Sequence, residues 1–306
     1  MSVLVFGHKN PDTDSICAAI AVADLKSKLG LDCKPTSQGE LTPESKFVLD
    51  KFGLSAPETV TSVAGQKVIL VDHSDLAQSP DDLKEAEILG IIDHHKLGDV
   101  TTPNPLECWI WPVGCTCTVI KAMYDFYGVE IPKNIAGAML CAILSDTVIF
   151  KSATCTEDDK KACEALAGVA GISDMTALGM EMFKVKSAVD KDTPRDLLFR
   201  DYKDFSMGGN KVGIGQLEVV DLSIVEPVKD ALYEEMKKVK EEGGRNAVYL
   251  MLTDIMKEGT ELLVLADDPA PVQKAFGKPV DGNSVWLDGV MSRKKQVVPN
   301  FEKAYG

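Results

Sequence analysis

The stretch that decides the fold is VLVFGHKNPDTDS, residues 3–15. Its first four residues, Val3–Phe6, form an apolar run with the length and composition of a buried strand. Pro11 stiffens the polar loop that follows, and helical periodicity then runs over Ser15–Leu29 and ends at Gly30. A strand that turns through a short loop into a helix is the first half of a βαβ unit, and such units build parallel sheets.

The same alternation continues through the first half of the chain. Two further apolar runs, Val68–Val71 and Ile88–Ile92, predict strands. Helical periodicity predicts helices over Thr118–Tyr127, Ile135–Leu144 and Glu157–Val169. Strands that alternate with helices indicate an α/β fold with a parallel sheet covered on both faces.

The pattern changes near Val185, which indicates a second domain. The stretch 186–194 is polar and contains DKDTP at 190–194, a composition typical of a linker. We therefore predict a domain at 1–187, a hinge linker at 188–194 and a second domain at 195–306. A chain of 306 residues is long enough for two domains of ordinary size.

The second domain is predicted to be a smaller α/β unit with a mixed or antiparallel sheet. Tyr202–Met207 and Lys211–Leu217 flank the turn sequence GGN, which favours a hairpin. A charged amphipathic helix is predicted over Glu226–Glu242. Two more strands are predicted at Ala247–Thr253 and Glu261–Ala266.

The amino-acid composition limits which binding partners and which cellular compartment are expected. The chain has 33 basic and 47 acidic residues, a net charge of −14, which disfavours non-specific binding to nucleic acid or to an anionic membrane. Its apolar runs are shorter than 18 residues, so we expect no transmembrane helix, and the N-terminus has no signal-peptide pattern. Eight cysteines without a CxxC pair favour a reduced, cytoplasmic protein.

Acidic and imidazole side chains follow the apolar segments of the first domain. They are His8, Asp12, Asp14, Asp72, His73, Asp93, His94, His95 and Asp146. Any one of the acids could be a helix cap or a turn residue, and we expect His73 to support the site rather than bind a metal. Because binding sites form beyond the carboxyl ends of parallel strands, we expect these segments to converge on one crevice.

The number of acids predicts a two-metal site. Five carboxylates that converge would repel one another unless cations neutralised them, and one ion cannot use so many ligands. Carboxylate and imidazole ligands without a thiolate suit Mn²⁺, Co²⁺ or Fe²⁺ better than structural zinc. A pair of metal ions is the usual device for in-line displacement at phosphorus.

A basic cluster near the C-terminus could bind an anionic substrate. The sequence SRKKQ, residues 292–296, places Arg293 and Lys294 between apolar residues of an otherwise acidic protein. Arginine binds phosphate oxygens through two parallel hydrogen bonds, and lysine adds a point charge. The simpler interpretation is a basic run exposed to solvent. Lys203 could be a further cation of this kind, although nothing close to it in the sequence indicates so.

Together these motifs resemble the family II, manganese-dependent inorganic pyrophosphatases of the DHH phosphoesterase superfamily. The motifs are residues 7–15 (GHKNPDTDS), 71–73 (VDH), 93–95 (DHH), 145–146 (SD) and 292–296 (SRKKQ). They occur in the family's order between residue 2 and about residue 299. The third motif marks only the superfamily, whereas the first and the last together are specific to the pyrophosphatases. The short interval from Asp72 to Asp93 indicates the form without a regulatory nucleotide-binding insert.

The resemblance implies the metal ligands by position. His8 and Asp12 are implied as ligands of the first metal ion, and Asp14 and His94 as ligands of the second. Asp72 and Asp146 are implied as bridging ligands between the two ions. Two Mn²⁺ ions in each subunit are implied, with Co²⁺ as a possible substitute.

The resemblance also implies the substrate contacts and supporting residues. The substrate contacts are His95, Lys203, Arg293 and Lys294, and Asp93 would orient a neighbouring histidine. Residues 114–118, GCTCT, lie where the family has a helix start rich in glycine and threonine near the site. Ser74 and Asp75 replace the asparagine and glutamate of many relatives, so their roles stay open.

The implied reaction is hydrolysis of pyrophosphate to two orthophosphates by a hydroxide that bridges two metal ions. A further Mg²⁺ would arrive with the substrate, and the active site would lie in a cleft between the two domains. A homodimer formed through the N-terminal domain is also implied.

Three alternatives compete with this interpretation, two of them other phosphoesterases of the superfamily and one a protein without catalysis. The nearest is an exopolyphosphatase of the same superfamily, and hydrolysis of tripolyphosphate compared with pyrophosphate would separate the two activities. An exonuclease is disfavoured because no histidine follows His95. A metal-dependent sensor without catalysis would be expected to have lost ligands, and every expected ligand is present.

Overall fold

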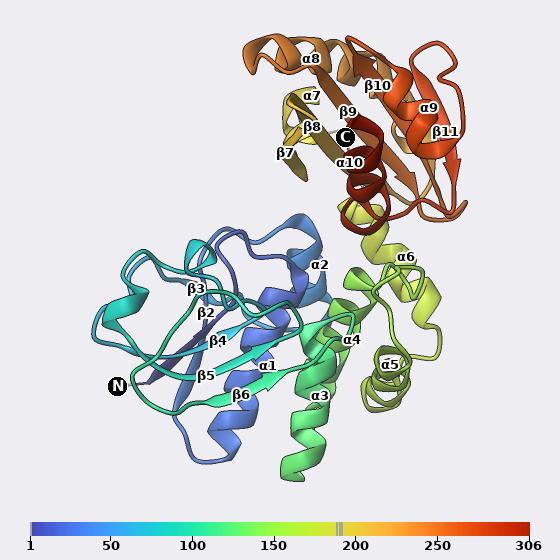
Figure 1. Ribbon diagram of the computed structural model, residues 1–306. Helices are drawn as coiled ribbons and strands as arrows, with labels where there is room; N and C mark the ends of the chain where they lie inside the picture. Colours follow the sequence, from blue (N-terminus) through green and yellow to red (C-terminus); the bar gives the residue numbers. More distant parts are fainter. Residues whose placement is uncertain (1, 188, 190–191) are drawn as a thin grey trace. The chain divides into compact units, whose positions relative to one another are not determined.

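The computed structural model describes residues 2–187, 189 and 192–306, which form two compact units divided between Val185 and Lys186 (Figure 1). Within the predicted hinge, residues 188, 190 and 191 lie outside the described residues. Val189 is buried, and Thr193 caps helix α7 (Pro194–Phe199). None of the described helices is long and apolar enough to cross a membrane.

The first unit contains a sheet of six parallel strands. Their order is β3 (Glu58–Thr59), β2 (Cys33–Ser37), β1 (Val3–Phe6), β4 (Lys67–Val71), β5 (Glu87–Asp93) and β6 (Glu107–Ile110). The strands predicted from apolar runs, β1, β4 and β5, are confirmed. The other three are short or polar strands that the sequence did not reveal.

The predicted helices of the first unit are also confirmed, with small shifts at their ends. They are α1 (Thr13–Lys28), α3 (Thr116–Tyr127), α4 (Lys133–Asp146) and α5 (Glu157–Ala170). Two further helices, α2 (Pro43–Phe52) and α6 (Met175–Lys186), were not predicted. α1 begins at Thr13 because the side chain of Asp12 accepts a hydrogen bond from the backbone of Ser15.

The two faces of this sheet are covered differently. α1 packs beside α3 and α4, and α3 packs on β5 (Figure 1). The opposite face buries Phe6, Leu70 and Ile91 under loops and the 3₁₀ turn Leu83–Glu85 rather than under helices. Both faces are therefore covered, as predicted, but helices cover only one of them.

The second unit contains a mixed sheet of five strands. The order is β11 (Ser284–Asp288), β10 (Gly259–Ala266), β9 (Ala247–Asp254), β8 (Asn210–Val219) and β7 (Tyr202–Met207). β8 and β9 pair in parallel and the other neighbours pair antiparallel, which confirms the predicted mixed sheet and its hairpin at β7–β8.

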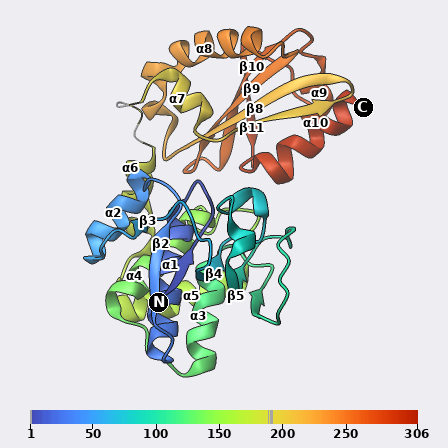
Figure 2. The same ribbon diagram turned by 90° about the vertical axis from the view of Figure 1, so that its left-hand side faces the viewer.

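Helices lie on both faces of the second sheet. α7 and α8 (Lys229–Glu242) pack on one face, and α9 (Ala270–Phe276) and α10 (Val298–Tyr305) pack on the other (Figure 2). The predicted start of α8 at Glu226 is wrong by three residues, because Glu226–Val228 forms a separate 3₁₀ turn around Pro227.

Candidate metal centre

Three adjacent strands carry the candidate metal ligands to one end of the first sheet. β1, β4 and β5 lie side by side, and the loops at their carboxyl ends carry His8, Asp72 and His94 within their first two residues. The strand order reverses between β1 and β4, because the chain passes outward from β1 to β2 and returns to β4 on the other side. A crevice beyond the strands at such a reversal is the usual place for a ligand site.

Gly7 lets the end of β1 approach the first turn of α1. A Cβ atom at this position would lie 2.4 Å from Ser15 Oγ, which is far inside van der Waals contact. Glycine therefore fits here because the backbone must pass close to the serine side chain.

The first candidate ligand group consists of His8, Asp12 and Asp72. One ligand atom from each lies within 4.8 Å of the others. His8 Nε2 is 3.6 Å from Asp12 Oδ2 and 3.3 Å from Asp72 Oδ2. Burial lowers the pKa of His8, but hydrogen bonds and charge from Asp12 and Asp72 outweigh it and raise the pKa to about 10. The carboxylates of Asp12 and Asp72 thus stabilise the protonated, positively charged ring of His8.

The second candidate ligand group consists of Asp14, His94 and Asp146, again within 4.8 Å of one another. Nδ1 of His94 lies 3.0 Å from the carbonyl oxygen of Val113, so this nitrogen donates and Nε2 keeps its lone pair for a metal. Asp146 is the last residue of α4. The α4 helix, rather than a strand, therefore supplies this carboxylate.

Asp72 lies between the two groups. Its Oδ1 is 3.5 Å from His94 Nε2, while its Oδ2 faces His8. Asp72 is 2% exposed, and burial raises the pKa of its carboxyl group, with the charges of Asp14 and Asp12 adding to the effect. A carboxylate in this position fits a ligand shared by two ions, because cations would remove the repulsion among these acids. Asp146, by contrast, is grouped only with Asp14 and His94 among the described residues.

Two thiols also lie close to Asp14. One ligand atom from each of Asp14, Cys115 and Cys117 lies within 4.8 Å of the others. Burial raises the pKa of both thiols well above the usual range, and the charge of Asp14 raises it further. Neutral thiols are weak ligands, so the carboxylates and imidazoles remain the better donor set for a hard divalent cation such as Mn²⁺.

His95 is oriented by Asp93 and stays partly exposed. Its Nδ1 donates to Asp93 Oδ1 at 2.9 Å, and the side chain of His95 is 44% exposed. Burial lowers the pKa of His95, but the hydrogen bond to Asp93 together with the charges of Asp72, Asp93 and Asp14 outweighs it, and the net direction is upward. These neighbours therefore favour the protonated form of His95, whose partly exposed ring can face an anion.

The residues that follow Asp72 support the loop. Both ring nitrogens of His73 are bonded, Nδ1 to the carbonyl of Val71 and Nε2 to Ser79 Oγ, and burial lowers the pKa of His73 to about 4. His73 therefore fastens the loop that follows Asp72, and its role as a support of the site stays a prediction. Ser74 Oγ accepts from the backbone of Gly98 at 2.9 Å, which is also a structural contact.

The basic cluster of the second unit is only partly a solvent-exposed run, because Arg293 is 9% exposed whereas the two lysines that follow it are exposed. Its Nη1 donates to the carbonyls of Asp201 and Ile214 at 2.7 and 3.2 Å, and its Nη2 donates to Asp201 Oδ1 at 2.6 Å. Lys203 stands opposite Ile214 in the β7–β8 ladder, which brings it close to Arg293. Lys294 follows Arg293 and is exposed.

The loop of this cluster is fastened by two glutamines. Gln296 Oε1 accepts from the backbone of Met291 and Ser292 at 2.8 and 2.9 Å. Gln216, buried on β8, accepts from the backbone of Arg293 at 3.2 Å and donates to the carbonyl of Met291 at 2.9 Å. The backbone of Arg293 is thus fixed independently of its side chain.

Comparison with known proteins identifies both halves of the chain. The model described as DHH family, N-terminal domain, matches residues 2–143, and the DHHA2 domain model matches residues 180–304. An Archaeoglobus fulgidus protein named "Probable manganese-dependent inorganic pyrophosphatase" is 58% identical over 99% of this chain and 98% of its own length. A Bacillus subtilis protein named "Manganese-dependent inorganic pyrophosphatase" is 42% identical over 97% of this chain and 96% of its own length.

The chain belongs to the manganese-dependent inorganic pyrophosphatases. Within this family, a crystal structure of a Methanococcus jannaschii protein assigned to family II aligns with a TM-score of 0.78 and 46% identity, covering 100% of this chain and 99% of that one. An exopolyphosphatase-related protein from Bacteroides fragilis aligns at a TM-score of 0.51 and 11% identity, covering 99% of this chain and 91% of its own. The similarity to the Bacteroides fragilis structure supports only the assignment of the fold.

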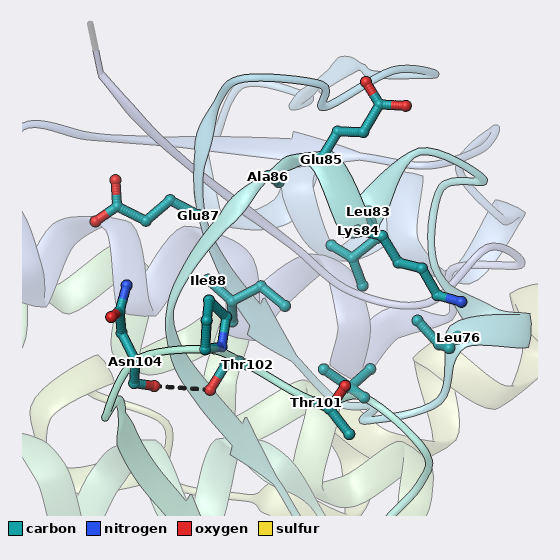
Figure 3. A pocket seen from close by; sticks show the side chains of 12 residues that line it. Leu76, Leu83, Lys84, Glu85, Ala86, Glu87, Ile88, Thr101, Thr102 and Asn104 are labelled. Carbon is teal, nitrogen blue, oxygen red and sulfur yellow. Dashed lines mark hydrogen bonds between the residues drawn. The ribbon is translucent and has the colours of Figure 1, made fainter.

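A pocket in the first unit of this pyrophosphatase lies apart from the candidate ligands. It has a volume of about 340 Å³ and is lined by parts of residues 76–88 and 100–104 (Figure 3). Its lining includes Lys84, Glu85 and Glu87 but none of the candidate metal ligands. The candidate metal centre therefore rests on its side-chain chemistry rather than on this pocket.

Several supporting residues were not predicted from the sequence. Glu44 of α2 is 4% exposed and accepts from Thr13 Oγ1 at 2.8 Å and from Ser145 Oγ at 3.0 Å. Asp159 of α5 is fully buried and accepts from the backbone of Gly114 at 2.8 Å. The helix predicted over Glu157–Val169 includes Asp159 but gives no sign of its contact with Gly114, and Glu44 had no signal because α2 was not recognised.

Proposed function

We propose that this protein hydrolyses inorganic pyrophosphate to two orthophosphates with two Mn²⁺ ions bound in the first unit. The observation that carries the proposal is that Asp72 joins two ligand groups at the carboxyl ends of β1, β4 and β5. We assign His8 and Asp12 to one ion, Asp14 and His94 to the other, Asp72 to both, and Asp146 to a bridging role. Co²⁺ is a further candidate for these sites, since the donor set is the same.

The residues of the chain have separate tasks in this reaction. When bound, the two ions would activate a water molecule and neutralise charge on the substrate. His95 would donate a hydrogen bond from Nε2 to the departing phosphate, because Asp93 occupies Nδ1 and favours the cationic ring. His94 would keep its Nε2 directed to a metal because Nδ1 is committed to Val113.

The second unit would bind the negatively charged substrate. Two donors of Arg293, Nε–H and one N–H of Nη2, have no hydrogen-bond partner among the described residues, so they are available to hold a phosphoryl group. Lys203 and Lys294 would add positive charge beside it. Arg293 would stabilise charge that develops on the attacked phosphoryl group, and a further Mg²⁺ would accompany the substrate.

The direct test is to titrate metal-free protein with Mn²⁺ and to follow both metal binding and phosphate release from pyrophosphate in the presence of Mg²⁺. We expect two bound Mn²⁺ per chain and activity that rises with their occupancy. Tripolyphosphate is the comparison substrate, because faster release from it would favour an exopolyphosphatase. Binding of one ion, or no release of phosphate with both sites filled, would contradict the proposal.

We also propose that two chains associate through the first unit. β6 is an edge strand of the sheet, and the rings of Trp109, Phe126 and Tyr127 cluster beside it with centroids 5.0–6.4 Å apart. Phe126 is 71% exposed, and an exposed aromatic cluster at an open sheet edge favours association. Buried thiols such as Cys17 and Cys141 are typical of a reducing compartment, and we propose a cytoplasmic location.

A further inference from the structure

Two hydroxyl groups hold Asp72 from opposite sides. Ser15 Oγ donates to Asp72 Oδ2 at 2.8 Å, and Thr116 Oγ1 donates to Asp72 Oδ1 at 3.0 Å. Ser15 is 1% exposed and Thr116 is fully buried, so water does not compete strongly for these bonds. Ser15 comes from the first turn of α1, and Thr116 is the first residue of α3.

The direction of each hydroxyl is set by its neighbours. Ser15 Oγ accepts from the backbone N–H of His8 at 3.3 Å, so its own proton is available for Asp72. The backbone N–H of Thr116 donates to Asp14 Oδ2 at 2.7 Å, and that of Cys117 donates to Asp14 Oδ1 at 3.1 Å. Thr116 therefore contacts two candidate ligands of the ion at His94, the shared Asp72 through its side chain and Asp14 through its backbone.

Each oxygen of Asp72 meets one hydroxyl and at least one imidazole, and Oδ1 also lies 3.7 Å from His95 Nδ1. Oδ2 faces Ser15 and, at 3.3 Å, His8 Nε2, whereas Oδ1 faces Thr116 and, at 3.5 Å, His94 Nε2. A carboxylate oxygen has two lone pairs, so a hydroxyl bond on one leaves the other for a cation on the imidazole side. The two halves of the carboxylate are thus assigned to different ligand groups.

The backbone of Asp72 is strained, which makes external support for its side chain more important. Its φ is +60°, a left-handed conformation that non-glycine residues rarely adopt. Strained residues persist only where their surroundings fix them, and here the Asp72 N–H donates to the carbonyl of Ile92 at 2.9 Å. The hydroxyls of Ser15 and Thr116 complete this support at the carboxylate.

We propose that Ser15 and Thr116 are positioning residues that fix Asp72 as a ligand shared by both metal ions. Ser15 controls the affinity of the ion at His8 and Asp12, and Thr116 controls the affinity of the ion at Asp14 and His94. This inference rests on the proposed two-metal function. If the hydroxyls only satisfied a buried carboxylate, removing either of them would not selectively lower the affinity for one of the two ions.

The test measures Mn²⁺ binding to the full-length protein by titration calorimetry, with electron paramagnetic resonance to detect coupling between the two ions. Thr116→Val removes the hydroxyl at nearly constant volume, and we expect one Mn²⁺ affinity to fall 10- to 100-fold with loss of the coupled signal. Thr116→Ser should restore both because it returns the hydroxyl. Ser15→Ala should weaken the other ion by a similar factor.

Thr118→Val is the matched control. Thr118 lies on the same helix and donates its buried hydroxyl to Asp159 at 2.6 Å, a carboxylate outside the candidate ligand set. Its loss should lower the unfolding temperature without changing either Mn²⁺ affinity. If Thr116→Val folds poorly, Thr116→Ala provides a variant without a methyl group in the place of the hydroxyl.

A His94→Gln background separates this inference from the proposed function. It should leave one tight Mn²⁺, at His8 and Asp12, and two tight ions in this background would instead refute the ligand assignment. With the assignment intact, Ser15→Ala should weaken the remaining ion, and Thr116→Val should change its affinity less than threefold. Equal effects of both variants, or effects no larger than those of Thr118→Val, would overturn the positioning roles.

Discussion

Truncation of Arg293 to alanine should separate substrate charge stabilisation from metal binding. Arg293 belongs to the second unit, whereas every candidate metal ligand belongs to the first. We expect Arg293→Ala to lower kcat roughly 10²- to 10³-fold, the effect of removing one preorganised charge-stabilising group. The Mn²⁺ affinities should remain within a factor of two.

The same substitution should also lower stability, by an amount that follows from the contacts of Arg293. Truncation removes the donors to two backbone carbonyls and to Asp201 Oδ1. The carbonyls account for about 1 kcal/mol each. The ion pair adds about 1 kcal/mol at most, because the Asp201 side chain is 54% exposed. We therefore expect the free energy of unfolding to fall by about 2–3 kcal/mol, while Gln216 still holds the backbone.

Arg245→Ala is the control for this loss of stability. Arg245 pairs with both oxygens of Asp204 at 2.6 and 2.7 Å, lies in the same unit, and is not a proposed substrate contact. Denaturant unfolding should give similar losses for the two variants, and steady-state assays with pyrophosphate should give a low kcat only for Arg293→Ala. The reasoning is refuted if both variants lose kcat equally, or if Arg293→Ala weakens Mn²⁺ binding as much as it slows turnover.

Four further predictions follow from individual contacts. His94→Gln should weaken one of two Mn²⁺ sites at least tenfold in calorimetry with the unfolding curve unchanged, and two equally tight sites would contradict the assignment. Because the pKa of His8 is raised to about 10 without metal, Mn²⁺ binding at pH 7 should release a proton from this ring. The Mn²⁺ affinity should therefore rise with pH up to about pH 10. A pH-independent affinity would exclude His8 as a ligand. Asp159→Ala should lower the free energy of unfolding by about 2–4 kcal/mol in denaturant titrations, since it leaves buried donors of the backbone of Gly114 and the side chain of Thr118 unpaired. Phe126→Glu should shift light-scattering mass from dimer to monomer while Met256→Glu, at another exposed apolar residue, should not.

Elements with strong apolar periodicity could be predicted from the sequence. Strands that form only because they pair with a distant strand could not. β1, β4 and β5 have apolar runs because both of their faces are buried. β2, by contrast, reads CKPTS, and a lysine and a proline do not indicate a strand. Its ladder with β1 is formed by residues about 30 positions away, which no local pattern reveals.

The candidate ligands could be predicted because they follow apolar segments, but their supports lie far along the chain. Thr116 reaches Asp72 across 44 positions, and Ser145 reaches Glu44 across 101. Gln216 fixes the backbone of Arg293 across 77 positions from the middle of a strand. Such contacts depend on how whole helices and strands pack together. A single sequence therefore shows which polar residues are present but not which of them form hydrogen bonds with one another.

Capping and metal binding are compatible tasks of the same carboxylate, because its two oxygens point to different partners. Asp12 Oδ1 accepts from the backbone of Ser15 at 2.9 Å and so begins α1, while Oδ2 lies 3.6 Å from His8. Asp14 accepts from two backbone N–H groups at the start of α3 and also belongs to the group with His94. The helix starts therefore fix the orientation of the acids before a metal arrives, since their N–H groups favour the charged carboxylate. This arrangement lowers the cost of assembling like charges at one place, and it explains why a segment of nine residues, 7–15, can serve both the fold and the site.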